Sequence, residues 1–99
     1  MVLILFRSKL TEAAGDDDTA MNATMRAHAE QFPGFVDIKS FTAEDGERLS
    51  VVRWQDHETL AAWRNDAAHG RAQALGREKW YEHFVIEVAD LVRSEEFQR

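Results

Sequence analysis

The chain has 99 residues, no cysteine and a formal net charge of −6 at neutral pH. A chain of this length forms one domain with one modest core, and the absence of cysteine excludes disulfides, thiolate metal ligands and a cysteine nucleophile. The acidic balance argues against a nucleic-acid partner, because neutralising phosphates needs clustered Lys and Arg side chains.

No apolar run approaches the roughly 20 residues that span a bilayer, and the apolar run at the N-terminus is too short for the core of a signal peptide. We therefore expect one cytoplasmic domain over residues 1–99, with no membrane partner. Residues 93–99 are expected to form a polar tail in which only Phe97 docks.

The first part of the chain predicts a strand followed by a helix. Residues 2–8 are apolar and rich in branched side chains, which is typical of a buried strand. The acidic run at residues 16–18 suits a helix N-terminus, so we expect a helix to start near Thr19. Pro33 and Gly34 end it, because proline cannot continue the helical hydrogen bonds.

A hairpin follows this helix. Residues 35–42 and 49–54 both alternate between apolar and polar side chains, and Asp45-Gly46 lies between them. An Asp-Gly pair between two alternating runs predicts a β-hairpin.

Two helical pieces are expected after the hairpin. Asp56 is a suitable N-cap for a helix that carries Trp63 on its apolar face. Asp66 is a second N-cap, for a piece that carries His69, and we expect Gly76 to stop that piece.

The alternating residues 84–92 complete the order β-α-β-β-α-β. This order predicts an α+β, ferredoxin-like fold in which a four-stranded antiparallel sheet carries the helices on one face. We expect the helix-facing rows of the sheet to hold Ile4, Phe6, Val36, Ile38, Val52, Trp54, Phe84, Ile86 and Val88.

The opposite face of the sheet mixes apolar residues, Phe35 among them, with charges of both signs. A face exposed to water would be more uniformly polar. We therefore expect a second copy of the chain to cover it, which gives a homodimer packed sheet against sheet, a dimeric α/β barrel.

Residues 54–81 hold all three tryptophans and the only tyrosine. Trp54, Trp63, Trp80 and Tyr81 are candidates to line a pocket for a small aromatic molecule, and their positions allow them to converge at one end of the sheet. The alternative is that these rings fill the core between sheet and helices.

His69 is the candidate for chemistry, because it lies beside a helix break and Gly70. Its imidazole could serve a phenolic or enolic substrate as a base or hydrogen-bond partner, or it could stabilise the helix junction. His28, on the stripe of the first helix, is a second candidate contact for the substrate, or a core histidine.

No nucleotide, zinc-protease or serine-hydrolase motif is present. The four histidines are not spaced to place two metal ligands on one helix face. We expect no metal site.

Several local motifs together carry a resemblance to a known family. They are Phe32-Pro33-Gly34-Phe35, the hairpin of residues 41–47, Val52-Arg53-Trp54, Leu60-Ala61-Ala62-Trp63 and Asp66-Ala67-Ala68-His69. With them, the chain resembles an antibiotic biosynthesis monooxygenase (ABM) domain from residue 2 to about residue 92.

The resemblance implies a ferredoxin-like monomer that dimerises through its sheets, and a monooxygenase that oxidises a phenol or quinol with dioxygen and no cofactor. His69 matches the histidine that recurs in the family after the second helix. Haem-degrading relatives use an asparagine on the first strand, a helix tryptophan and a later histidine. Trp63 matches that tryptophan, but Phe6-Arg7 and Gln73 stand at the other two positions. Haem is therefore only an alternative cofactor, and a non-catalytic dimeric module that binds a small molecule is a further alternative.

Overall fold

A computed structural model of the chain describes residues 1–12 and 15–99, and the side chains of these residues except 15–19, 67–68 and 78. The predicted N-cap at residues 16–18 lies outside the described side chains. The elements are β1 (Val2–Leu10), α1 (Gly15–Glu30), β2 (Phe35–Thr42), β3 (Arg48–Trp54), α2 (His57–Arg64), α3 (Ala67–Leu75), the π-helical turn η1 (Gly76–Trp80) and β4 (Tyr81–Asp90).

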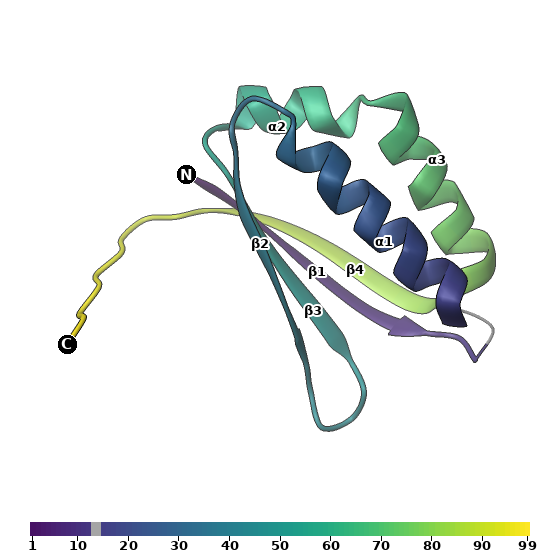
Figure 1. Ribbon diagram of the computed structural model, residues 1–99. Helices are drawn as coiled ribbons and strands as arrows, with labels where there is room; N and C mark the ends of the chain where they lie inside the picture. The colour runs from purple at the N-terminus through teal and green to yellow at the C-terminus, as the bar shows by residue number, and fades with distance from the viewer. Residues whose placement is uncertain (13–14) are drawn as a thin grey trace.

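The four strands form one sheet in the order β2-β3-β1-β4, and every neighbouring pair is antiparallel. All of the helices lie on one face of this sheet, with α1 and α3 side by side along it (Figure 1). The ferredoxin-like α+β fold predicted from the order of the elements is confirmed.

Local side-chain chemistry sets the element boundaries that the sequence predicts. The carboxylate of Asp56 accepts a hydrogen bond from the backbone N–H of Thr59 at 2.8 Å, and α2 begins directly after Asp56, at His57. The Asp66 carboxylate accepts from the N–H of His69 at 2.9 Å and caps α3 in the same way. In the β2–β3 hairpin, Gly46 has φ of +90°, a conformation that favours glycine.

A register shift in β2 changes which of its residues face the helices. Phe35 pairs with Trp54, whereas Asp37 pairs with the next residue of β3, Arg53, so the shift lies between Phe35 and Asp37. The ring of Phe35 packs edge-on against Trp54, and Val36 is 44% exposed. The prediction that Val36 faces the helices and Phe35 the opposite side is therefore wrong, because an extra residue in one strand reverses the alternation.

The α-helix α3 ends at Leu75, before Gly76, as predicted, but Gly76 does not stop the helical course of the chain. Its φ is −59°, a right-handed helical value, and the chain continues as η1 to Trp80. The last strand begins at Tyr81, directly after this turn, rather than at residue 84. A Cβ atom on Gly76 would lie 2.5 Å from Cε2 of Tyr81, so glycine is needed here for the close approach of that ring.

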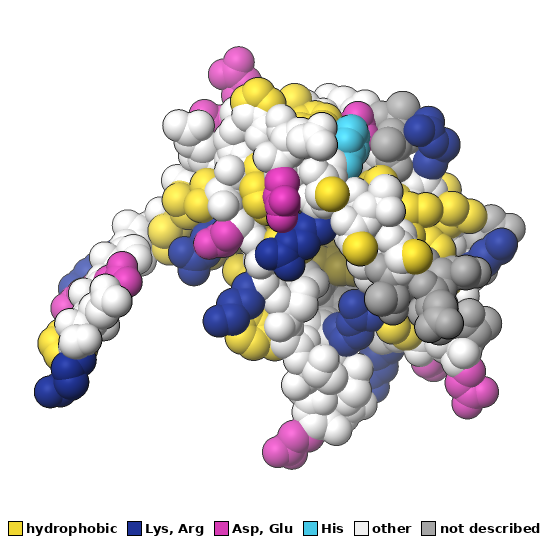
Figure 2. Space-filling model, viewed as in Figure 1, with side chains coloured by type: hydrophobic (Ala, Val, Ile, Leu, Met, Phe, Trp, Pro, Cys, Tyr) yellow, Lys and Arg dark blue, Asp and Glu magenta, His cyan; other side chains and the backbone are white. Residues whose placement is uncertain are grey.

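The core lies between the sheet and the first two helices, and its buried members are Val2, Ala29, Trp54, Leu60 and Trp63. No helix in the described part of the chain is long and apolar enough to cross a membrane. The segment after β4 projects from the body as an extended arm (Figure 2). Phe97 is 81% exposed on this arm, so the prediction that it docks is wrong. The guanidinium carbon of Arg99 lies 5.6 Å from the centre of its ring.

Candidate functional site

His69 lies at the junction of α2 and α3, against the side chain of Trp63. The two rings are stacked with centroids 4.3 Å apart. His69 Nδ1 lies 3.2 Å from the backbone carbonyl oxygen of Trp63. A carbonyl oxygen can only accept a hydrogen bond, so Nδ1 carries the proton and donates it.

Burial lowers the pKa of His69 below its ordinary value of 6.5, although the hydrogen bond to Trp63 and the charge of Asp66 partly oppose the shift. The imidazole is therefore neutral near pH 7, with its proton on Nδ1 and a lone pair on Nε2. No described residue makes a hydrogen bond to Nε2. His69 can thus accept a hydrogen bond or a proton at this atom.

Asp66 connects His69 to the first helix. Its Oδ2 lies 2.9 Å from the backbone nitrogen of His69 and 3.0 Å from Nε2 of His28. His28 also packs against Trp63, with ring centroids 5.6 Å apart. The predicted substrate contact of His28 is not tested by this arrangement, but one of its ring nitrogens already has a carboxylate partner.

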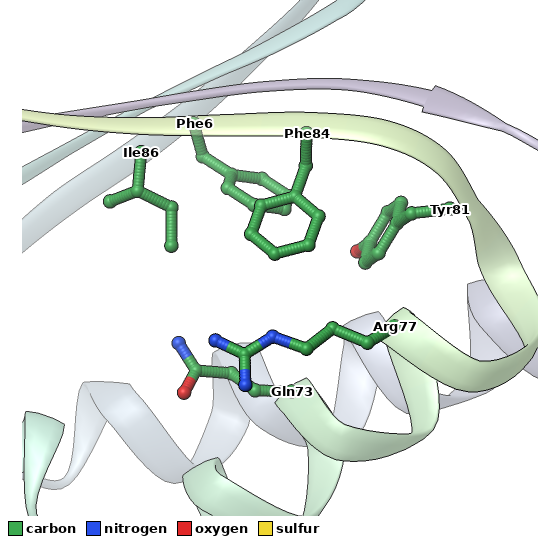
Figure 3. A pocket seen from close by; sticks show the side chains of 6 residues that line it. All are labelled: Phe6, Gln73, Arg77, Tyr81, Phe84 and Ile86. Atoms are coloured by element: carbon green, nitrogen blue, oxygen red, sulfur yellow. The ribbon is translucent and has the colours of Figure 1, made fainter.

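A groove lies between the sheet and the last helical segment (Figure 3). Phe6 of β1 and Phe84 and Ile86 of β4 form its floor, and Gln73 and Arg77 extend toward them from α3 and η1. Tyr81 closes one end, with its ring 5.4 Å from that of Phe6. The space between these side chains is about 20 Å³, which is room for about one water.

The floor of the groove continues along β4 beyond this space. Ile86 pairs with Phe6 and Val88 with Ile4, so both side chains lie on the helix-facing side of the sheet. Even so, Ile86 is 42% exposed and Val88 is 44% exposed. The groove is therefore open to solvent along this edge.

One face of the last helical segment forms the other wall. His69, Gln73 and Arg77 follow one another at intervals of four residues, which places them along the same side of a helix. Gln73 and Arg77 line the groove, and His69 lies one turn before Gln73. A ligand in the groove could therefore meet Arg77 toward one end and His69 toward the other.

The four predicted aromatic wall residues do not converge at one end of the sheet. Trp54 pairs with Val2 at the start of β1, whereas Tyr81 pairs with Leu10 at its other end. Trp54 and Trp63 contact each other within the core, with ring centroids 6.0 Å apart. The rings separate because a nine-residue strand lies between the two sites.

The neighbours Trp80 and Tyr81 line different hollows. Tyr81 faces the groove, whereas Trp80 lies in a more open hollow of about 360 Å³ with Met21, Leu75 and Lys79. Leu75 and Lys79 are two residues out of step with Gln73 and Arg77, which places them on a different side of the helix. Of the predicted wall residues, Tyr81 alone lines the groove among the side chains that the structure describes.

Sequence reasoning did not identify Phe6, Gln73, Arg77, Phe84 and Ile86 as one lining. A signal for the helix wall was present in the spacing of four residues from His69 to Gln73 and Arg77. Their position opposite β4 depends on the packing of the segment against the sheet.

Within the described side chains, no group of three or more His, Asp or Glu residues could hold a metal ion. The expectation of no metal site stays a prediction.

Comparisons with known proteins identify relatives by sequence and neighbours by structure. No protein-family model matches the chain. It is 31% identical over 86 residues to the uncharacterized protein YqjZ of Bacillus subtilis, covering 84% of this chain and 75% of that protein. It is 28% identical over 105 residues to the jasmonate monooxygenase ABM of Pyricularia oryzae, covering 100% of this chain and 48% of that protein. The chain thus spans about half the length of the fungal protein.

Solved structures share the fold at low sequence identity. A crystal structure of an antibiotic biosynthesis monooxygenase superposes with a TM-score of 0.79 at 15% identity, over 94% of this chain and 100% of that one. SnoaB, a cofactor-independent oxygenase from Streptomyces nogalater, superposes with a TM-score of 0.80 at 15% identity, over 94% of each chain.

Proposed function

Because the chain belongs to the antibiotic biosynthesis monooxygenase (ABM) family, we propose that it is a cofactor-independent monooxygenase. Its substrate is an aromatic phenol or quinol, bound in the groove between β4 and the α3–η1 segment. The likeness in fold to a cofactor-independent oxygenase supports this reaction class. A cytoplasmic location and a homodimer are parts of the same proposal.

The reaction needs no outside reductant. With a quinol, one oxygen atom of O₂ enters a ring C–H bond as a hydroxyl group while the quinol becomes a quinone, and the other oxygen leaves as water. With a phenol that reacts as its keto tautomer, such as an anthrone, the oxygen instead replaces the two hydrogens of the CH₂ group as a carbonyl. The substrate supplies all four electrons, and the two hydrogens that it loses become those of the water. The protein therefore has to form the electron-rich anion of the substrate and hold it away from solvent.

His69 is proposed to take the proton from the hydroxyl group of the substrate. Its Nε2 carries the lone pair, because Nδ1 donates to the Trp63 carbonyl oxygen at 3.2 Å. The stacked indole fixes the plane of the imidazole. A neutral, oriented histidine is suited to act as a general base near neutral pH.

The groove is proposed to supply the apolar surface on which the rings of the substrate lie. Its floor consists of Phe6, Phe84 and Ile86, and it is open along the exposed side chain of Ile86. Because the space is about 20 Å³, the flexible side chains of Gln73 and Arg77 must move for a substrate to enter. Trp54 and Trp63 are core residues that support His69, because Trp63 stacks on the imidazole and Trp54 packs against Trp63.

The residues of the groove do not fit the haem alternative. Phe6 and Gln73, at two of the positions that haem-degrading relatives use, both line the groove. Neither a phenyl ring nor a carboxamide is a customary axial ligand of haem iron. We therefore propose no step through haem.

The proposal rests on the neutral His69, which lies one helical turn before Gln73, and on the groove with an aromatic floor that Gln73 lines. The test is oxygen uptake by the purified protein with a panel of naphthoquinols and anthrones, followed by mass spectrometry of products formed under ¹⁸O₂. We expect one labelled oxygen atom per product molecule. Binding of these compounds without any oxygen uptake would instead indicate a non-catalytic binding module.

A further inference from the structure

We propose that Arg77 is a binding site for an anionic oxygen group of the ligand, such as a carboxylate. The ligand class is thereby narrowed to elongated, apolar molecules that carry an anion at one end and a reactive hydroxyl at the other. This inference rests on the proposed function for the role of the groove, and it adds the charge of the ligand.

The position of Arg77 supports this role. Its side chain extends from η1 into the groove, opposite the floor formed by Phe6, Phe84 and Ile86 (Figure 3). The guanidinium carbon is 5.7 Å from the ring centre of Phe84. This contact is with an aromatic face and leaves the N–H groups at the edge of the guanidinium free to bind an anion.

Arg77 makes no ion pair with any carboxylate among the described side chains, whereas several other arginines do. Arg7 pairs with Glu47 at 3.1 Å, Arg26 with Glu30 at 3.2 Å and Arg93 with Glu95 at 3.1 Å. The chain has 18 acidic residues against 12 basic ones, so carboxylates are in excess. A guanidinium that faces an apolar groove without such a partner is a suitable site for an anion brought by a ligand.

The neighbouring groups favour an anion over a cation or a neutral apolar end. Gln73 lies beside Arg77 on the same wall, and its carboxamide can donate further hydrogen bonds (Figure 3). The six residues that line this space include no carboxylate. The wall formed by Gln73 and Arg77 therefore presents several hydrogen-bond donors, and the floor opposite it is apolar.

The spacing along the helix sets the length of the ligand. Arg77 and His69 are eight residues apart, which corresponds to about 12 Å along a helix. A molecule that reaches both needs two or three fused rings between its anionic group and its reacting hydroxyl. A phenol with a single ring is too short to do so.

Binding of two matched probes tests this inference. 6-Hydroxy-2-naphthoate carries a carboxylate opposite its hydroxyl, and 6-hydroxy-2-naphthamide has nearly the same shape without the charge. Their dissociation constants are measured by calorimetry with the wild type, Arg77→Gln and Arg71→Gln. Arg71 is an exposed arginine of α3 that does not line the groove, so it controls for the loss of one positive charge.

We expect the wild type and Arg71→Gln to bind the naphthoate about tenfold or more tightly than the naphthamide, as a charge-assisted pair provides. Arg77→Gln should bind the two probes equally. Added salt should weaken the binding of the naphthoate alone. Equal binding of both probes by the wild type, or an unchanged preference in Arg77→Gln, would overturn the inference.

These results are separable from the fate of the proposed reaction. A preference for the naphthoate that depends on Arg77, in a protein that consumes no oxygen, would support the anion site and reject the monooxygenase activity. Oxygen uptake with quinols, without any preference for the anionic probe, would support the monooxygenase activity and reject the anion site.

Discussion

The ring of Tyr81 packs so closely against Gly76 that its Cε2 atom would lie 2.5 Å from a Cβ atom at that position. This contact links the last helical turn to the first residue of β4, at the end of the groove that Tyr81 closes. The shape of this end of the groove therefore depends on a glycine that lies outside its lining.

Gly76→Ala is expected to destabilise the protein by about 1–3 kcal/mol, because the methyl group forces the Tyr81 ring to move in a packed region. Gly70→Ala is the matched control, since a Cβ atom there would have no described atom within 4 Å apart from its chain neighbours and the nearby backbone of its own helix. The control should stabilise α3 by about 0.4–1 kcal/mol through helix propensity and chain entropy. Urea unfolding measures both, and similar effects of the two substitutions would contradict the contact.

The indole Nε1 of Trp54 is buried without a hydrogen-bond partner among the described residues, and the residue has no exposed surface. Trp54→Phe should therefore destabilise the protein by about 1 kcal/mol less than Trp80→Phe, because it also removes an unsatisfied donor. Trp80 is similarly buried, at 5% exposure. Unfolding free energies of both variants test this, and an equal or larger cost at Trp54 would show that its N–H is satisfied in solution.

The local parts of the fold could be predicted from the sequence because they depend on nearby residues. Asp56 and Asp66 cap helices through bonds to residues three positions later, and Asp45-Gly46 forms a turn of four residues. The extra residue at Val36 could not be predicted, because it appears only when β2 pairs with β3.

The site was predictable only in part. His69 could be selected from its place beside a helix break, but the groove that it adjoins could not be assembled. Phe6, Gln73 and Ile86 come from three elements, and their meeting depends on how α3 packs over β4. The aromatic rings were easier to notice than the polar wall, yet most of them serve the core.

The pKa of His69 is lowered in the folded protein, so stability should fall as the pH falls. Below the unfolded value of 6.5, the unfolded chain takes up a proton that folded His69 does not, until the pH passes the lower folded pKa. Above 6.5 this contribution is complete and constant. Urea unfolding between about pH 8 and about pH 5 should show a smaller loss in His69→Gln than in the wild type. Identical losses would contradict the lowered pKa.

The sheet face opposite the helices is predicted to bind a second copy of the chain. Four of its charged residues already pair within one chain, Arg7 with Glu87 at 3.8 Å and Arg53 with Asp37 at 3.7 Å. The half-buried Leu5 lies among them and pairs with Val51 in the sheet. Dimerisation would therefore bury apolar surface without leaving these charges unpaired.

Sedimentation should accordingly give about twice the chain mass of 11.4 kDa for the wild type. Leu5→Glu should sediment as a monomer, because it places an unpaired charge in the interface. Ala23→Glu, on the exposed side of α1, should remain dimeric. A wild-type mass of one chain at micromolar concentration would contradict the dimer.

His69 is proposed to act as the base of a monooxygenase, and the rate of oxygen uptake by His69→Gln at saturating quinol tests this role directly. His57→Gln is the control, because His57 lies on the surface, 64% exposed and paired with Asp90. We expect the rate of His69→Gln to fall by about 10²- to 10⁴-fold, the usual contribution of a general base. His57→Gln should keep the wild-type rate. A His69→Gln variant that consumes oxygen as fast as the wild type would contradict the assignment.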